Sequence, residues 1–272
     1  MSKPSSNGFK LREEEVTPAL AERFLRRNHS NRNISRHHVN LLVRAMTQGD
    51  WRRTGDPIRF SSDGFLLDGQ HRLQAIVLSG QKQTLTVVEG VKPESQLVMD
   101  IGRKRSLTDH FTMNEEKYPN TLAATLRMVW SYQRGEASGK ALTPSHLELL
   151  QLLKQSPGIR ESVFEGERVA RVIRGSRALY ASANWILSGI DQDDAAFFFD
   201  RLVDGANLVT EDAIFALRRV LEKDAFAARK LHTSHRLALI IKAWNAYRQG
   251  TPVKTLIWRR GGARPEPFPV PV

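Results

Sequence analysis

The stretch from Leu66 to Ile76 constrains the fold of this chain more than any other part of its sequence. Two leucines typical of a strand are followed by Asp68, then by Gly69, and then by residues that favour a helix. The first turn of a helix leaves backbone N–H groups without partners and carries the positive end of the helix dipole. The sequence therefore predicts a strand, a glycine turn and a helix start that would stabilise a bound phosphate.

The residue types from Asp68 to Arg72 each have a separate use at such a turn. Gly69 allows an unusual backbone conformation and a close approach by a ligand, because it has no Cβ. Arg72 can grip phosphate oxygens with its guanidinium, and His71 can donate a further hydrogen bond. The carboxylate of Asp68 is suited to hold a magnesium ion or to orient a hydroxyl group or a water. In the alternative interpretation, Asp68 only caps the helix, while His71 and Arg72 are solvated on its surface.

The surrounding pattern predicts a small domain that contains both strands and helices. Pro57–Phe60 and Phe65–Leu67 are apolar runs joined by Ser61–Gly64, which holds an Asp-Gly pair typical of a hairpin. Apolar residues at helical spacing predict helices over about residues 18–27, 35–48 and 70–78. Runs rich in β-branched or apolar residues predict two further strands, over 84–88 and 98–102.

After Phe111 the sequence changes character, and nearly every later segment is typical of a helix. Apolar faces at helical spacing are carried by residues 122–130, 147–153, 195–202, 211–221 and 234–249. In the second of these, the buried face is expected to consist of Leu147, Leu150 and Leu153. The tail is basic and then rich in proline, and it is expected to be extended and mobile.

The fold class predicted from these patterns is α+β, with a small mixed-sheet domain followed by an all-helical domain. The expected parts are a flexible leader (1–8), a phosphate-binding domain (9–112), a helical domain (113–250) and the tail (251–272). No repeat of 20 to 50 residues is evident, so a solenoid is not expected.

The chain is strongly basic and lacks cysteine. Lysine and arginine outnumber the acidic residues by 41 to 29, which gives a net charge of +12 and an isoelectric point near 10.3. This charge indicates a polyanionic partner such as nucleic acid, and a basic surface without a specific partner is the alternative.

Without cysteine, disulfides, thiolate metal sites and thiol nucleophiles are excluded, and a cytoplasmic location is expected. No signal-peptide core and no apolar run of the roughly 20 residues that span a bilayer is found, so no membrane association is expected.

The turn at Gly69 and its surroundings resemble the phosphate-binding signature of the ParB/sulfiredoxin superfamily. In that superfamily, an Asn- and Arg-containing segment, a helix and a Pro-Ile strand precede a strand that leads into a Gly-x-x-Arg turn and helix. In this chain, these places are occupied by Asn31–Ile34, the helix to Gln48, Gly49–Trp51 and Pro57–Phe60. The resemblance is closer to the branches with an Asp-Gly-x-His-Arg turn, which include serine kinases and DNA-modification proteins of a phage or mobile-element type.

The resemblance covers roughly residues 9–112 and implies a protein that binds a nucleoside triphosphate, ATP or CTP, together with Mg²⁺. It further implies a nucleoside triphosphatase or an ATP-dependent kinase, which hydrolyses or transfers the γ-phosphate in a DNA-associated process such as DNA modification. The expected catalytic residues are Asp68, His71 and Arg72, the expected nucleotide-binding residues are Gly69, Gln70, Arg32, Arg103 and Arg105, and the expected metal ligands are Asp68 and Asp100. A homodimer is compatible with the sequence, and the motif does not specify the base or the phosphate acceptor.

Two departures from the superfamily narrow this interpretation. Gln70 occupies the position of the reactive cysteine of sulfiredoxins, and the chain has no cysteine at all, so a sulfinic-acid reductase is excluded. His71 replaces an arginine of the plasmid-partition CTPases, which argues against CTP preference and sliding-clamp behaviour.

A second charged cluster runs from Asp100 to Asp109, where the superfamily carries its later phosphate and metal contacts. Arg103 and Arg105 would reach the β- and γ-phosphates, and Asp100 would share the metal ion. In the alternative interpretation, Ser106 caps the next helix and Asp109 completes a capping box.

A competing hypothesis is a non-catalytic DNA-binding protein, in which the turn at Gly69 grips a phosphate of the DNA backbone. The charge for this hypothesis would come from arginines spread along the chain, namely Arg26, Arg27, Arg32, Arg36, Arg52, Arg53, Arg259 and Arg260. A third hypothesis joins the two, with nucleotide chemistry that acts at or near DNA.

Two further patterns are expected to be structural rather than functional. Gly166–Arg171 superficially resembles the partition-CTPase motif, but no strand precedes it and it lies in a helical region. Trp244 and Tyr247 lie beside basic residues, yet their helical spacing with Leu237 favours a place in the core.

Overall fold

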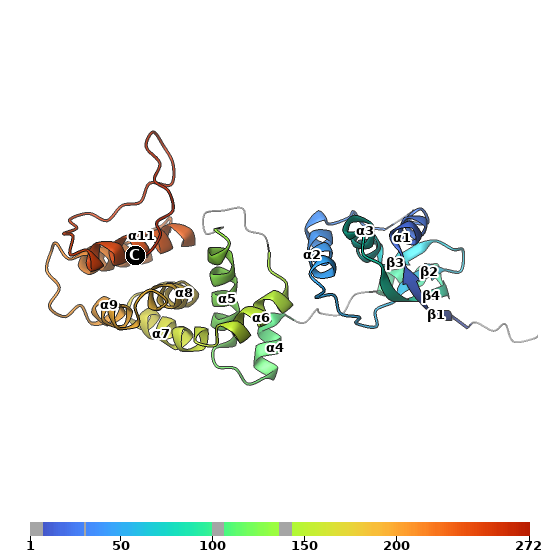
Figure 1. The fold of residues 1–272 in the computed structure, drawn as a ribbon, viewed down its shortest axis with the longest axis horizontal. Helices are drawn as coiled ribbons and strands as arrows, with labels where there is room; N and C mark the ends of the chain where they lie inside the picture. The colour runs from blue at the N-terminus through green and yellow to red at the C-terminus, as the bar shows by residue number, and fades with distance from the viewer. Residues whose placement is uncertain (1–7, 30, 100–105, 136–142) are drawn as a thin grey trace, which may run out of the picture. The chain divides into compact units, whose positions relative to one another are not determined.

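The computed structural model describes residues 8–29, 31–99, 106–135 and 143–272. The chain forms two compact units, residues 1–104 and 105–272. The fold is α+β, as predicted, with a mixed sheet and its helices in the first unit and helices in the second (Figure 1).

The N-terminal unit holds all the strands of the described part of the chain. Its elements are β1 (Lys10–Val16), α1 (Pro18–Leu25), α2 (Arg36–Thr47), β2 (Ile58–Ser61), β3 (Leu66–Asp68), α3 (Gln70–Ser79), β4 (Gln83–Val91) and the 3₁₀ helix η1 (Pro93–Val98). The sheet order is β1-β4-β2-β3, with β4 antiparallel to β1 and parallel to β2. The antiparallel pair of β2 and β3 confirms the predicted hairpin.

Most of the expected elements of this unit are present, with two differences. The pattern did not predict β1, because its charged middle is depleted in strand-forming residues and only Val16 in it is buried. The strand expected over 98–102 is wrong at its start, since Val98 ends η1, and residues 100–102 lie outside the described part of the chain.

The core of the N-terminal unit forms where α1, α2 and α3 meet the sheet. Helix α3 packs against both α1 and α2 (Figure 1). Phe24 of α1, Ile58 and Phe60 of β2, and Leu73 and Ile76 of α3 are among the buried residues of this core. Since α3 packs against α1 and α2 and shares this core with the sheet, its first turn has a defined position beside the starts of α2 and β2.

The second unit is helical throughout its regular structure. Its elements are α4 (Leu107–Met113), α5 (Pro119–Gln133), α6 (His146–Gln155), α7 (Ile159–Val172), α8 (Arg177–Ser188), α9 (Gln192–Asp204), α10 (Ala213–Ala225) and α11 (Thr233–Arg248). The unit begins earlier than the boundary expected after residue 112, because Leu107 and Phe111 of α4 share a core with α5, α6 and α7. None of the helices in the described part of the chain combines the length and apolar character needed to span a membrane.

Two features of the helical unit refine the sequence interpretation. The fully buried leucines of α6 are Leu149, Leu152 and Leu153. Of the expected face, Leu153 is buried, Leu150 is half-buried and packs against the same core, and Leu147 is half-buried. As expected, Gly166 lies in a helix, within α7. A Cβ added at Gly166 would lie 2.5 Å from the carbonyl oxygen of Arg177 and 2.7 Å from the backbone nitrogen of Ala181, so glycine lets α7 approach α8 closely.

The C-terminal tail has no helix or strand, and it is packed against the helical unit. Trp258 is buried in the core that α7 to α11 share. The indole Nε1 of Trp244 donates to the carbonyl oxygen of Val272 at 2.9 Å. Asn245 Nδ2 donates to the carbonyl oxygen of Val270 at 2.8 Å, and its Oδ1 accepts from the backbone N–H of Val272 at 3.1 Å. The expectation of a mobile tail is therefore wrong, because aromatic and amide side chains of α11 bind it.

Candidate functional site

The predicted strand, glycine turn and helix start are confirmed in the N-terminal unit. Strand β3 ends at Asp68, Gly69 has a positive φ of 105°, and α3 begins at Gln70. A Cβ added at Gly69 would overlap the Cδ1 atom of Ile58 in β2. Both the backbone conformation and the packing therefore require glycine at this position.

The side chain of Gln70 connects the segment that precedes α2 to the start of α3 through hydrogen bonds. Its side chain is buried, with 4% of its surface exposed. Its Oε1 accepts from Asn28 Nδ2 at 3.0 Å, and its Nε2 donates to the backbone carbonyl of Arg32 at 2.8 Å. Gln70 thus positions Arg32, whose own side chain is exposed.

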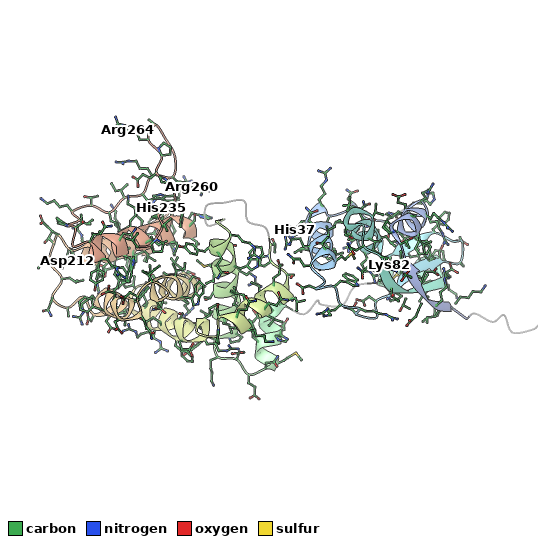
Figure 2. All side chains as sticks on the ribbon, in the orientation of Figure 1. His37, Lys82, Asp212, His235, Arg260 and Arg264 are labelled. Atoms are coloured by element: carbon green, nitrogen blue, oxygen red, sulfur yellow. The ribbon has the colours of Figure 1, made fainter. Side chains whose placement is uncertain are left out.

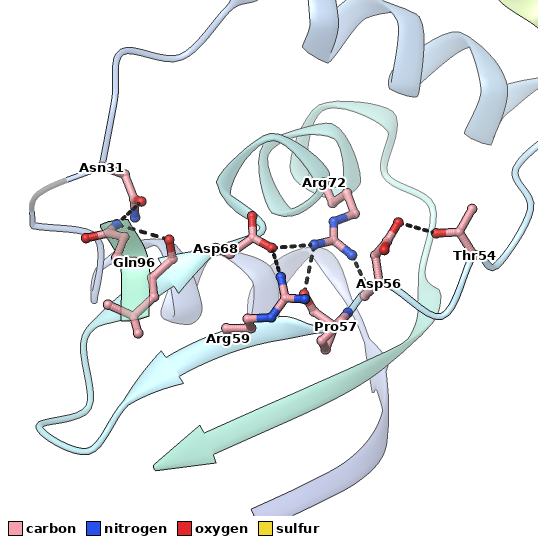
Figure 3. Close-up of polar contacts among 9 residues, drawn as sticks. Asn31, Thr54, Asp56, Pro57, Arg59, Asp68, Arg72 and Gln96 are labelled. Atoms are coloured by element: carbon pink, nitrogen blue, oxygen red, sulfur yellow. Dashed lines mark hydrogen bonds and ion pairs between the residues drawn. The ribbon is translucent and has the colours of Figure 1, made fainter. Parts of the chain in front are cut away.

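A second pair of amide side chains continues this network towards the sheet (Figure 3). Asn31 Nδ2 donates to the carbonyl oxygen of Leu66 at 2.6 Å. Gln96 Nε2, from η1, donates to Asn31 Oδ1 at 2.8 Å and to the carbonyl oxygen of Leu67 at 3.1 Å. Strand β3 is thereby tied to the loop before α2 and to η1.

His71 joins the first turn of α3 to the start of α2. Its ring is buried, with 9% of its surface exposed, and its Nε2 accepts from the backbone N–H of Ser35 at 3.0 Å. Because Nε2 is the acceptor here, the neutral ring carries its proton on Nδ1. Ser35 is the N-cap of α2, and its hydroxyl accepts from the backbone N–H of His38. The starts of two helices are therefore linked by one hydrogen bond.

Asp68, Arg59 and Arg72 form a charged cluster on the β2 side of the turn (Figure 3). Asp68 Oδ2 lies 2.5 Å from Arg59 Nη1 and 3.3 Å from Arg72 Nη2. Arg72 also donates to the backbone carbonyls of Asp56 and Pro57, the latter at 2.8 Å. Arg72 thus braces α3 against the segment that enters β2.

These contacts decide against the alternative in which this turn is an ordinary solvated helix start. Asp68 does not cap α3, because the N-cap is Gly69 and no side chain caps this helix. His71 is buried, and the Arg72 side chain is only 15% exposed. The described contacts hold the turn in place, and the catalytic roles expected for Asp68, His71 and Arg72 stay predictions.

Two arginines are exposed beside the linked helix starts. Arg32 lies in the segment held by Gln70, and Arg36 is the first residue of α2, next to Ser35. Neither has an ion-pair partner within the described ranges of the chain. We call the group formed by Arg32, Ser35, Arg36, Gly69 and His71 the helix-start site.

Of the two expected magnesium ligands, only Asp68 lies within the described part of the chain. Asp68 Oδ2 already accepts from two arginines, which would compete with a cation. Among the described residues, no group of three or more His, Cys, Asp and Glu side chains could hold a metal ion. Asp100 lies outside the described residues, and so do the expected phosphate ligands Arg103 and Arg105.

The residues that follow this undescribed segment form the capping box of the alternative interpretation. Ser106 is the N-cap of α4, and its hydroxyl accepts from the backbone N–H of Asp109 at 3.1 Å. Asp109 Oδ2 in turn accepts from the backbone N–H of Ser106 at 2.8 Å. These two residues start a helix of the second unit.

Sequence reasoning assigned no contact to several residues that hold the helix-start site in place. Asn28 and Asn31 lie between the helices predicted over 18–27 and 35–48, and Asn31 was named only as part of the Asn- and Arg-containing segment, without a partner. Arg59 and Gln96 carried no recognisable signal, because their partners are set by the packing of the sheet.

Comparison with known proteins does not assign the chain to a family. No protein-family model, no curated protein and no solved structure matches the chain. The membership in the ParB/sulfiredoxin superfamily therefore stays a prediction, which rests on the turn at Gly69 and on the order of the elements around it.

Proposed function

We propose that the N-terminal unit binds a nucleoside triphosphate, with its phosphates at the helix-start site. The observation that carries this proposal is the hydrogen bond from the Ser35 backbone N–H to His71 Nε2, which brings the starts of α2 and α3 together. Each helix start carries about half a positive charge from its dipole. Two such ends at one place favour a polyanion over a singly charged ligand.

Side chains around the site add to this attraction. Arg32 and Arg36 are exposed, and guanidinium groups bind phosphate oxygens in a bidentate manner. The negative charge of Asp68 is offset by Arg59 and Arg72, so it opposes a bound phosphate little. Gly69 supplies the positive φ with which β3 turns into α3, and its missing Cβ lets Ile58 pack against the turn.

The remaining residues of the turn act by positioning. Gln70 holds the backbone of Arg32, His71 holds the start of α2, and Arg72 braces α3 against the segment before β2. Preorganised donors of this kind stabilise charge without reorganisation, which also suits hydrolysis or transfer of a γ-phosphate. Magnesium, if required, would be bound mainly by the phosphates and by water. The net charge of +12 supports a DNA-associated setting for this chemistry.

A thermal-shift and calorimetric panel tests the proposal on the full chain. ATP, CTP, GTP, UTP and their diphosphates are compared with magnesium and with a chelator. A nucleotide at a hundred times its dissociation constant is expected to stabilise the fold by about 2.7 kcal/mol. Phosphate release, measured with and without DNA, tests the hydrolase activity separately.

Charge-removing variants locate the binding site. Arg32→Ala and Arg36→Ala are each expected to weaken nucleotide binding by about tenfold or more, since hydrogen bonds to charged groups contribute about 1.5–3 kcal/mol. Arg52→Ala, which removes an exposed arginine of the same unit, is the matched control and should leave the affinity within about threefold. The absence of any nucleotide shift, together with DNA binding that Arg32→Ala weakens, would support the competing DNA-backbone hypothesis instead.

A further inference from the structure

An exposed aromatic ring lies at one end of the helical unit. Phe226 follows the last residue of α10, and 75% of its surface is exposed. The guanidinium carbon of Arg174, from the segment between α7 and α8, lies 5.3 Å from the centroid of this ring. A ring so exposed is not a core residue, and its pairing with an arginine from another element gives it a defined place on the surface.

Four further cations lie close to Phe226 in the sequence. Arg219 and Lys223 lie one turn apart on α10, and Arg229 and Lys230 follow Phe226 in the loop to α11. All four are exposed, and like Arg174 they have no ion-pair partner in the part of the chain that the structure describes.

The acidic residues of the same stretch are engaged by other arginines. Glu222 pairs with Arg218 at 3.1 Å, and the buried Asp224 pairs with Arg236 at 2.6 Å. The positive charge around Phe226 is therefore not neutralised by its neighbours on α10. We call Arg174, Arg219, Lys223, Phe226, Arg229 and Lys230 the basic-aromatic surface.

A loop of the C-terminal tail brings more arginine to the same end of the unit. Residues 259–266 form a loop closed by the hydrogen bond from the Glu266 backbone N–H to the Arg259 carbonyl, at 2.7 Å. Figure 2 shows Arg264 near the tip of this projecting loop and Arg260 nearer its base. The ring of Trp258, which precedes the loop, contacts His235 near the start of α11 with centroids 5.2 Å apart.

The electrostatics of His235 connect the loop with the end of α10. Burial lowers the pKa of His235, the carboxylate of Asp224 opposes this effect, and the charge of Arg260 adds to it. Asp224 Oδ1 also accepts from the backbone N–H of Leu231 at 2.6 Å, in the loop that follows Lys230. Because Trp258 contacts His235, and Arg236, the next residue, pairs with Asp224, the base of the arginine loop lies near the end of α10.

We propose that the basic-aromatic surface binds single-stranded nucleic acid. Its cations would contact the phosphates, and an unpaired base would stack on the open face of Phe226, as exposed aromatic rings in basic grooves do. In a duplex, the faces of the bases are stacked on one another and cannot stack on this ring. The exposed Phe226 therefore favours a single strand. A lone ring among cations also lacks the wide apolar face by which a helix enters a membrane. This surface belongs to the helical unit, so the proposal is independent of nucleotide binding in the N-terminal unit.

Fluorescence anisotropy with the full chain and a labelled 20-residue oligothymidine tests the proposal. Phe226→Ala is expected to weaken binding about tenfold, as loss of one base-stacking ring does, without a change in salt dependence. Phe226→Trp keeps a ring and should bind as the wild type does.

Arg229→Glu with Lys230→Glu is expected to weaken binding more than tenfold and to lower the slope of log affinity against log salt by about 1.4, from two single-strand phosphate contacts. Arg264→Glu tests the loop and should weaken binding severalfold.

Matched controls separate this surface from net charge. Lys117→Glu with Lys154→Glu makes the same change in net charge at exposed lysines outside the surface and should alter the affinity by less than about twofold. Circular dichroism melting of each variant checks that it is folded.

Three results would overturn the proposal. The first is wild-type affinity in Phe226→Ala. The second is a loss in the doubly substituted Arg229 and Lys230 variant no larger than in the lysine control. The third is binding to a matching duplex or to phosphatidylserine vesicles at least as tight as to oligothymidine and with the same dependence on these residues.

Discussion

His71 and Arg72 are neighbours in the chain, yet their side chains hold different parts of the N-terminal unit. His71 accepts from the backbone of Ser35 at the start of α2, whereas Arg72 donates to carbonyls before β2 and to Asp68. Successive residues at a helix start point in different directions, because each turns by about 100° around the axis. The turn at Gly69 is therefore braced from two sides by adjacent residues.

Gly69→Ala is expected to destabilise the N-terminal unit by about 2–4 kcal/mol, from left-handed strain and from overlap with Ile58. Gly80→Ala is the control, since Gly80 also has a positive φ of 68° but a Cβ there meets nothing within 4 Å. The control should lose only the backbone contribution, about 1–2 kcal/mol. Hydrogen exchange of α3 peptides measures both, and equal losses would show that the contact with Ile58 is unimportant.

At the scale of elements, α8, α10 and α11 meet around a buried phenol. Tyr180 of α8 is almost fully buried, and burial raises its pKa to about 12. Arg236 of α11 lowers the pKa of this phenol and Asp224 of α10 raises it, which places the ends of three helices together. Their association is thus sensitive to the charge on one hydroxyl group.

This shift predicts a loss of stability at alkaline pH. The unfolded phenol has the ordinary pKa of 10.0, so the protonated ring contributes its full stabilisation below that pH and loses it as the pH rises towards about 12. The loss should reach about 3 kcal/mol in the free energy of unfolding. Tyr180→Phe removes the titration, so the comparison is between the two proteins in urea unfolding from pH 9 to pH 12. Identical pH profiles would contradict the assignment to Tyr180.

At the scale of the whole molecule, the two units have separate cores, and the tail belongs to one of them. The core of the helical unit includes Leu256 and Trp258 from the segment after α11. Lys242 of α11 pairs with Glu266 at 2.5 Å, and Trp244 binds the carbonyl of Val272. The tail therefore completes the packing of α11.

Deletion of residues 265–272 is expected to destabilise the helical unit by about 2–4 kcal/mol, because several hydrogen bonds at about 1 kcal/mol each are lost together with apolar burial. Hydrogen exchange should accelerate in peptides of α11. Peptides of α3 serve as the internal control, since α3 lies in the other unit. Unchanged exchange in α11 would mean that the tail is bound too weakly to matter for stability.

The sequence by itself determined the elements whose signals are local. The caps at Thr17, Ser35 and Ser106 act within three residues of themselves, so the start of each of these helices is a local property of the sequence. Gly69 marked the turn between β3 and α3 for the same reason, since its conformation is a property of one residue. The sequence did not predict the charged strand β1, because its place in the sheet comes from pairing with β4 rather than from its own composition.

Only the tertiary structure decided how the helix-start site is assembled. The hydrogen bond between Ser35 and His71 spans 36 residues, and that between Asn28 and Gln70 spans 42. Such partners are brought together by the packing of α3 against α1 and α2, which no local pattern encodes. The same packing buried His71 and bound Arg72 to the segment before β2, so the residues that the motif marked for chemistry also hold the turn.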